Sequence, residues 1–84
     1  MKSCMITFRS VTPAQRSEEM LRRAGVECTI ARTPRWMEEQ GCGYSLAVDR
    51  WELPAAAELL RQRQIPFRKM YLLWESGDYE EIRV

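Results

Sequence analysis

The order of its helix and strand patterns constrains the fold of this chain more than any other feature. Short β-rich stretches alternate with two stretches whose apolar residues recur at helical spacing. A chain of 84 residues has room for one hydrophobic core, so these segments must pack together as one domain. In chain order, the expected segments are a strand at 4–8, a helix from 12 to a stop at 25, strands at 26–32 and 44–48, a helix at about 52–63, and a strand at 67–74.

This β-α-β-β-α-β order predicts an α+β fold, the ferredoxin-like βαββαβ sandwich. Both helices are expected on one face of a four-stranded antiparallel sheet with strand order 4-1-3-2, and the other face is expected to be open. Residues 1–74 are expected to form this single domain. Because Ser76-Gly77-Asp78 signals a turn, residues 75–84 are interpreted as a C-terminal tail or a short added strand.

Local signals define the ends of the first helix. Thr12 is the expected cap, Pro13 suits the first helical position, and Gln15 completes a T-x-x-Q capping box. Gly25 is expected to end the helix in the left-handed conformation, with Val26 as the apolar residue that follows it. The expected inner faces of the two helices are Ala14, Ser17, Met20, Leu21 and Ala24, and Leu53, Ala56, Leu59, Leu60 and Arg63.

The chain contains no histidine, which excludes several common kinds of site. Ser-His-Asp and Cys-His catalysis and histidine-based zinc sites all need that side chain. The formal net charge is +1, which gives no general field for nucleic acid, and an RNA-recognition module would also need more aromatic residues on its central strands. The sequence therefore predicts no autonomous catalysis, no cofactor and no nucleic-acid partner.

The three cysteines are Cys4, Cys28 and Cys42, an odd number without CxxC spacing. In the expected strand order two inter-strand steps, about 9.6 Å, separate Cys4 from Cys28. A disulfide tolerates a Cα separation of only about 7 Å, so both are expected to be unpaired sheet residues. Free thiols indicate a reducing compartment, which predicts a cytoplasmic protein. No segment is apolar over the ~18 residues of a membrane span, so no membrane partner is expected.

Gly41-Cys42-Gly43 is the segment in which the sequence points to chemistry. Two missing side chains expose the thiol and let backbone N–H groups converge on an anion. Arg35 lies seven residues earlier and would raise the thiolate fraction, whereas Glu38-Glu39 would oppose it. The alternative is that the segment only makes a tight entry into the next strand, with Cys42 as a buried, inert residue.

Two short motifs lie at the junction of the expected second and third strands. Thr33-Pro34-Arg35 follows the second strand, and Cys42-Gly43-Tyr44-Ser45-Leu46 begins the third. With Ile6-Thr7-Phe8 and a helix of the TPAQRSEEMLRRAG type, the matching features cover about residues 4–73. On these features the chain resembles a family of small domains described as selenium/sulfur carrier proteins.

The resemblance implies that Cys42 is the carrier cysteine. Thr33, Pro34 and Arg35 would be the flanking motif, with Gly41 and Gly43 on either side of the thiol. The implied cargo is a sulfur atom held as a persulfide, or selenium in the analogous form. The implied partners are a donor of the cysteine desulfurase type and an acceptor protein of unknown identity.

A protein–protein interaction or self-association module is the alternative from another class. One uncovered sheet face and two edges are available for docking in a ferredoxin-like fold, so a homodimer stays open. The chain also has more large aromatic side chains than so small a core can hide, and these could anchor a partner. They are Trp36, Tyr44, Trp51, Tyr71, Trp74 and Tyr79.

Overall fold

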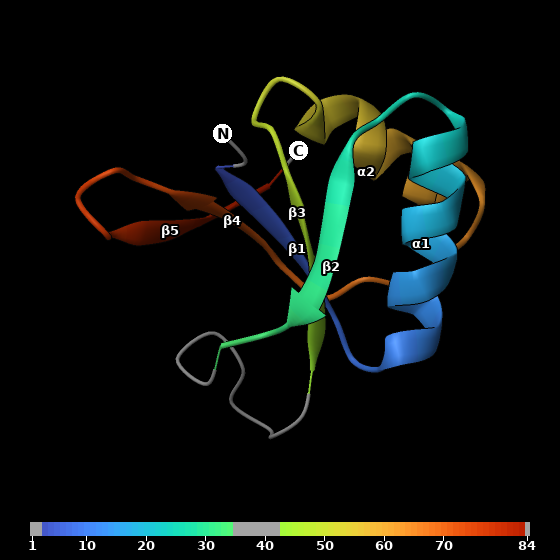
Figure 1. Cartoon of the computed structure of the whole chain (residues 1–84), viewed down its shortest axis with the longest axis horizontal. Coiled ribbons are helices and arrows are strands. Elements are labelled where there is room, and N and C mark those ends of the chain that lie inside the picture. The colour runs from blue at the N-terminus through green and yellow to red at the C-terminus, as the bar shows by residue number, and fades with distance from the viewer. Residues whose placement is uncertain (1–2, 35–42, 84) are drawn as a thin grey trace.

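The computed structural model describes residues 3–34 and 43–83 of the chain. In this part of the chain, two helices lie on one face of an antiparallel sheet of five strands (Figure 1). The bounds of the elements are β1 Cys4–Phe8, α1 Val11–Arg23, β2 Cys28–Arg32, β3 Tyr44–Val48, α2 Leu53–Gln62, β4 Met70–Leu73 and β5 Tyr79–Ile82.

The strand order is β2-β3-β1-β4-β5. Four of these strands, β2, β3, β1 and β4, are neighbours in the order that the sequence predicts. The sheet also contains a fifth strand, β5, whereas four strands were expected. The fifth strand forms because Gly77 adopts a φ of +93° and Trp74 exchanges backbone hydrogen bonds with Gly77 and Asp78, at 2.9 and 2.8 Å. The tail therefore folds back along β4 and extends the sheet.

The hydrophobic core lies between the sheet and the two helices. Alternate residues of β1 point toward the helices, so Cys4, Ile6 and Phe8 are almost fully buried. Directly opposite Ile6, the register places Leu46 of β3 on one side and Met70 of β4 on the other, and both are buried. The helices contribute Ala14, Ser17, Leu21, Leu53, Ala56, Ala57 and Leu60 to this layer.

The start of α1 corrects the expected capping box. The helix begins at Val11 with Ser10 as its N-cap residue, and no side-chain hydrogen bond caps it. Thr12 is thus inside the first turn and is not the cap. Pro13 lies in the same turn, where the first N–H groups have no partner inside the helix and a missing one costs little. The Pro13 carbonyl accepts a 2.7 Å hydrogen bond from the hydroxyl of Ser17, which makes a buried serine compatible with the core.

The end of α1 forms as the sequence predicts. Gly25 has a φ of +86°, its N–H donates to the Arg22 carbonyl at 3.1 Å, and the Val26 N–H donates to the Leu21 carbonyl at 2.8 Å. These two bonds make a Schellman motif, which gives the last carbonyls of the helix hydrogen-bond partners. Val26 is buried, whereas Ala24 lies outside the inner face to which its spacing assigned it.

Other element ends differ from the expected ones. Strand β2 starts at Cys28 rather than 26, α2 spans Leu53–Gln62, and Arg63 is exposed at the end of α2.

Strand β4 starts only at Met70 because the backbone of Thr7 in β1 hydrogen-bonds to two successive residues, Arg68 and Lys69. Its carbonyl accepts from the Arg68 N–H at 2.7 Å, and its N–H donates to the Lys69 carbonyl at 2.8 Å. Two residues opposite one is the pattern of a bulge, which interrupts the regular ladder.

The face of the sheet without helices is closed at its centre, contrary to the expectation of an open face. Thr7, Ser45 and Tyr71 belong to this face, yet their exposed fractions are only 3%, 0% and 6%. The ring of Tyr79 contacts that of Tyr71 edge-on, with centroids 5.8 Å apart. Among the described residues, the most exposed aromatic side chains are Trp74 and Tyr79, near the β4–β5 turn, and Trp51, between β3 and α2.

Replacing Gly25 tests the left-handed end of α1. Gly25→Ala should lower the free energy of unfolding by about 1 kcal/mol, because an alanine resists positive φ. No atom lies within 4 Å of an added Cβ, so the loss would report backbone strain rather than a clash. Gly25→Asn should lower the free energy of unfolding by less than Gly25→Ala does, since asparagine tolerates this conformation. Urea unfolding measures both variants, and an alanine variant as stable as the parent would contradict the prediction.

Candidate functional site

One backbone hydrogen bond joins the two motifs of the candidate site. The Thr33 N–H donates to the Gly43 carbonyl at 2.9 Å. This bond continues the pairing of β2 with β3 by one step beyond Arg32 and Tyr44. It lies at the end of the sheet where β2 ends and β3 begins (Figure 1). The Thr-Pro sequence and the residue that follows Cys42 are therefore held side by side.

The structure describes only part of the expected site. Thr33 is buried with an exposed fraction of 8%, Pro34 is half-buried, and Gly43 is buried. Arg35, Gly41 and Cys42 lie outside the described residues. The sequence-predicted residues that the structure brings together are thus Thr33, Pro34 and Gly43.

Two buried hydroxyl groups lie beside this hydrogen bond. Thr33 Oγ1 and Ser45 Oγ are both inaccessible to solvent and have no hydrogen-bond partner within residues 3–34 and 43–83. In the β2–β3 register Ser45 is opposite Ala31, so continuing that register makes Thr33 its diagonal neighbour on the face without helices. Diagonal neighbours of this kind lie roughly 7–8 Å apart between Cα atoms. Both hydroxyls therefore belong to one small region at the motif end of the sheet.

A third hydroxyl on the same face, that of Thr7, both donates and accepts a hydrogen bond. Thr7 is directly opposite Ser45, and its hydroxyl donates to the Lys69 carbonyl at 3.2 Å and accepts from the Lys69 N–H at 3.0 Å. The Ser45 hydroxyl has no such bonds. A buried hydroxyl without a partner costs about 1–3 kcal/mol, so this serine is unfavourable for folding unless it binds something. A hydroxyl so placed can donate a hydrogen bond to an anion.

Ser45 lies in the candidate site, although its sequence pattern did not single it out. The resemblance includes it only as one letter of a strand motif. The alternation of Tyr44-Ser45-Leu46-Ala47-Val48 already puts Ser45 on the face opposite the core. What the sequence could not show is that this position would be buried, because the helices cover only the other face.

The two cysteines in the sheet are buried thiols that do not form a disulfide. They lie opposite Val48 from its two sides, Cys4 in β1 and Cys28 in β2, so the third strand separates them as expected. Burial raises the pKa of the Cys4 thiol above its ordinary value. The Cys28 thiol lies 3.9 Å from the Glu18 carbonyl oxygen, toward which it can donate. Both are therefore poor nucleophiles in the folded protein.

Neither a metal cluster nor a membrane span is found in the part of the chain that the structure describes. No three His, Cys, Asp or Glu side chains there are grouped to hold a metal ion. No helix in those ranges is long and apolar enough to cross a bilayer.

Alkylation of the folded protein tests this description of Cys4 and Cys28. Both should be modified at least about tenfold more slowly than in urea, because alkylation needs an accessible thiolate. For Cys4 the protection should persist to higher pH, since its raised pKa keeps the thiol protonated. Peptide mass spectrometry reads each cysteine separately. Rapid modification of either thiol in native buffer, or a peptide linking the two, would overturn the buried, separated arrangement.

Comparison with known proteins adds one finding. The family model described as "Putative Se/S carrier protein-like" matches residues 3–72. Neither a curated protein nor a solved structure matches the chain. The match runs from the start of β1 into β4 and includes both motifs of the site, whereas β5 lies beyond it. Because the match covers well over half of its 84 residues, this chain belongs to the Se/S carrier protein-like family.

Proposed function

We propose that this protein is a carrier of sulfur or selenium that holds its cargo on Cys42. The 2.9 Å hydrogen bond between Thr33 and Gly43 carries the proposal. In the sequence, Thr33 begins the Thr-Pro-Arg motif and Gly43 directly follows Cys42, so this bond joins the described ends of the two motifs. Membership of the Se/S carrier protein-like family supports the same conclusion.

The proposed reaction is a transfer between thiolates. The Cys42 thiolate attacks the terminal sulfur of a donor persulfide and forms a new S–S bond. The S–S bond of the donor breaks, and its electron pair leaves on the donor cysteine, which takes up a proton. A thiolate of the acceptor then repeats the step on the terminal sulfur held by Cys42. No net oxidation occurs, and no histidine is needed.

The proposal assigns the surrounding residues to stabilisation of the sulfur anion. Arg35 supplies a positive charge, and Gly41 and Gly43 leave space for the cargo atom. The hydroxyls of Thr33 and Ser45, buried and without partners in the described ranges, donate hydrogen bonds to the anion. A hydrogen bond to a charged group contributes about 1.5–3 kcal/mol, which would offset the cost of burying such a hydroxyl.

The proposal has further parts that concern the whole protein. The strand order supports a ferredoxin-like arrangement of residues 1–74. A cysteine desulfurase-type enzyme would be the donor and a second protein the acceptor, so the chain would act in a relay without a catalytic cycle of its own. Cys4 and Cys28 do not form a disulfide, as is usual for proteins of a reducing compartment, which favours the cytoplasm.

Loading by a cysteine desulfurase tests the role of Cys42. With free cysteine as the sulfur source, the outer sulfur should appear on the Cys42 peptide, and Cys42→Ser should abolish loading because a hydroxyl forms no persulfide. Cys4→Ala and Cys28→Ala are matched controls that should load normally, since both thiols are buried in the sheet. Mass spectrometry of the peptides gives the answer. Equal loading of the Cys42→Ser protein would contradict the proposal.

The two hydroxyls are tested by Ser45→Ala and Thr33→Val. Each substitution should slow loading of Cys42 about tenfold, the kinetic equivalent of one lost hydrogen bond to an anion. The free energy of unfolding should stay equal or rise by about 1 kcal/mol, because a buried hydroxyl without a partner is removed. Thr7→Val is the contrasting control, and it should lower stability because the Thr7 hydroxyl is bonded. Variants that lose stability while loading normally would show that Thr33 and Ser45 serve the fold alone.

A non-catalytic interaction or self-association module is the second candidate function. Exposure of Trp74 and Tyr79, at 47% and 45%, favours it. Since the helix-free face is closed around Ser45 and Tyr71, a docking surface would lie at the β4–β5 margin rather than across the whole face. A protein that is never loaded by a desulfurase but binds a partner through these aromatics would support this candidate instead.

A further inference from the structure

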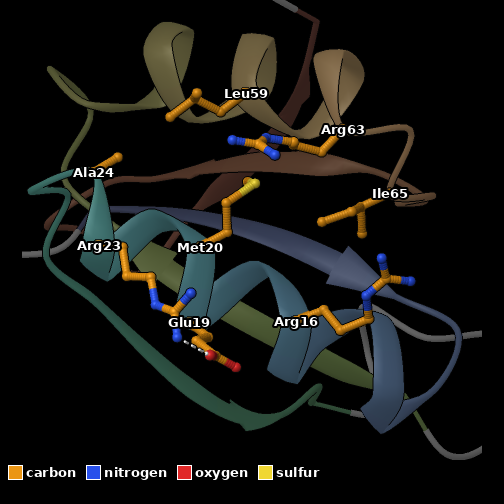
Figure 2. A pocket seen from close by; sticks show the side chains of 8 residues that line it. All are labelled: Arg16, Glu19, Met20, Arg23, Ala24, Leu59, Arg63 and Ile65. Carbon is orange, nitrogen blue, oxygen red and sulfur yellow. Dashed lines mark ion pairs between the residues drawn. The ribbon is translucent and has the colours of Figure 1, made fainter.

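A groove lies between α1 and α2 on the outer side of the helix layer. Figure 2 shows it with the side chains that line it. Its volume is about 430 Å³, and its apolar part is formed by Met20 of α1, Leu59 of α2 and Ile65, which follows α2. Met20 and Leu59 are only partly buried, so apolar surface is accessible inside the groove.

The rim of the groove is positively charged. Arg16, Arg23 and Arg63 line it together with Glu19. Arg23 is neutralised by Glu19 at 2.7 Å, whereas Arg16 and Arg63 have no ion pair within the described residues. Figure 2 shows the Arg63 guanidinium above Met20, with Arg16 on the side of Ile65. The four charges sum to +2, while the whole chain carries +1, so the rest of the protein has a net charge of −1.

The hairpin of β4 and β5 has the complementary character. Glu75 and Asp78 lie in its turn and Glu80 lies in β5, and all three are exposed, whereas the neighbouring Glu81 pairs with Lys69 at 3.8 Å. Trp74 and Tyr79 are exposed beside them. No lysine or arginine occurs between residues 74 and 82. Apart from Glu81, the hairpin therefore presents three carboxylates together with aromatic side chains on one projecting element.

The two surfaces cannot meet within one molecule. The groove is on the helix side of the protein, whereas the hairpin extends away from the helices at the other side of the sheet (Figure 1). The turn and β5 of the hairpin also lie beyond residues 3–72, the part of the chain that matches the family model.

We propose that the β4–β5 hairpin of one copy docks into the α1–α2 groove of a second copy. Glu75 and Glu80 would face Arg16 and Arg63, and the Trp74 ring would cover the apolar part of the groove. The contact joins two different surfaces, so a dimer keeps one groove and one hairpin unused, and association continues beyond the dimer. It uses neither Thr33 nor Gly43 and stands independently of the carrier function.

Complementary variants test this head-to-tail contact by sedimentation velocity. The groove variant is Arg16→Gln with Arg63→Gln, and the hairpin variant is Glu75→Gln with Glu80→Gln. The unaltered protein should associate beyond the dimer as its concentration rises, and each variant alone should associate about tenfold more weakly. An equimolar mixture of the two should form a 1:1 dimer and nothing larger, because it contains one intact groove and one intact hairpin for each pair.

A matched control separates the contact from an effect of net charge. Arg9→Gln with Arg83→Gln removes the same two charges from exposed positions outside the groove, and this protein should associate like the parent. Raising the NaCl concentration from about 50 to 500 mM should weaken association of the parent and of the control alike. Circular dichroism confirms that each variant is folded. A monomeric parent, a closed symmetric dimer, or a mixture that stays monomeric would overturn the proposal.

Discussion

The burial of β1 between two strands and under two helices is the constraint on which the rest of this structure depends. Cys4, Ile6 and Phe8 occupy alternate positions of the strand, and each is shielded by the helix layer. Because β1 pairs with β3 on one side and β4 on the other, a slip of one residue would turn this whole set toward the opposite face. The register of three strands is thereby fixed at once. With β3 in place, β2 pairs along it, and the last bond of that ladder joins Thr33 to Gly43.

The same constraint explains why two of the three thiols are unsuited to chemistry. Cys4 and Cys28 lie in the two strands that flank β3, and both face the helix layer opposite Val48. Small polarisable side chains suit such positions, where they pack as apolar residues. The burial that makes them good core residues also raises the pKa of Cys4 and so suppresses its thiolate. Enclosure by the sheet therefore makes Cys4 and Cys28 compatible with a reactive cysteine elsewhere in the chain.

Much of the fold could be predicted from the sequence because its signals are local. Strands β1 and β3 have the predicted bounds, and Gly25 ends α1 as its neighbours require. Long-range contacts explain the failures. The backbone of Thr7 hydrogen-bonds to both Arg68 and Lys69, which shortens β4. Neither strand's own sequence indicates this bulge. The Ser10 cap was missed because the T-x-x-Q pattern begins two residues later, at Thr12, whereas the third residue after Ser10 is Pro13.

The motifs of the candidate site could be predicted from the sequence, whereas the burial of its side chains could not. Spacing alone shows that the residues around Thr33 and Gly43 flank two neighbouring strands, and an antiparallel pair brings them together. The burial of Thr33 and Ser45 depends on what covers the face without helices, which no local pattern encodes. Arg63 illustrates the same limit, because its spacing placed it on an inner face and the structure leaves it exposed at a groove.

The two buried hydroxyls bear most directly on whether this end of the sheet is a site. A domain of 84 residues is stable by roughly 4–13 kcal/mol at typical values per residue. The Thr33 and Ser45 hydroxyls have no partner within residues 3–34 and 43–83, and two such groups would cost about 2–6 kcal/mol together, a large share of that margin. A serine opposite Ala31 could be alanine at no loss of packing, and a valine would fit in place of Thr33. A purely structural role therefore explains the hydroxyls poorly, whereas an anion held beside Gly43 would bind both.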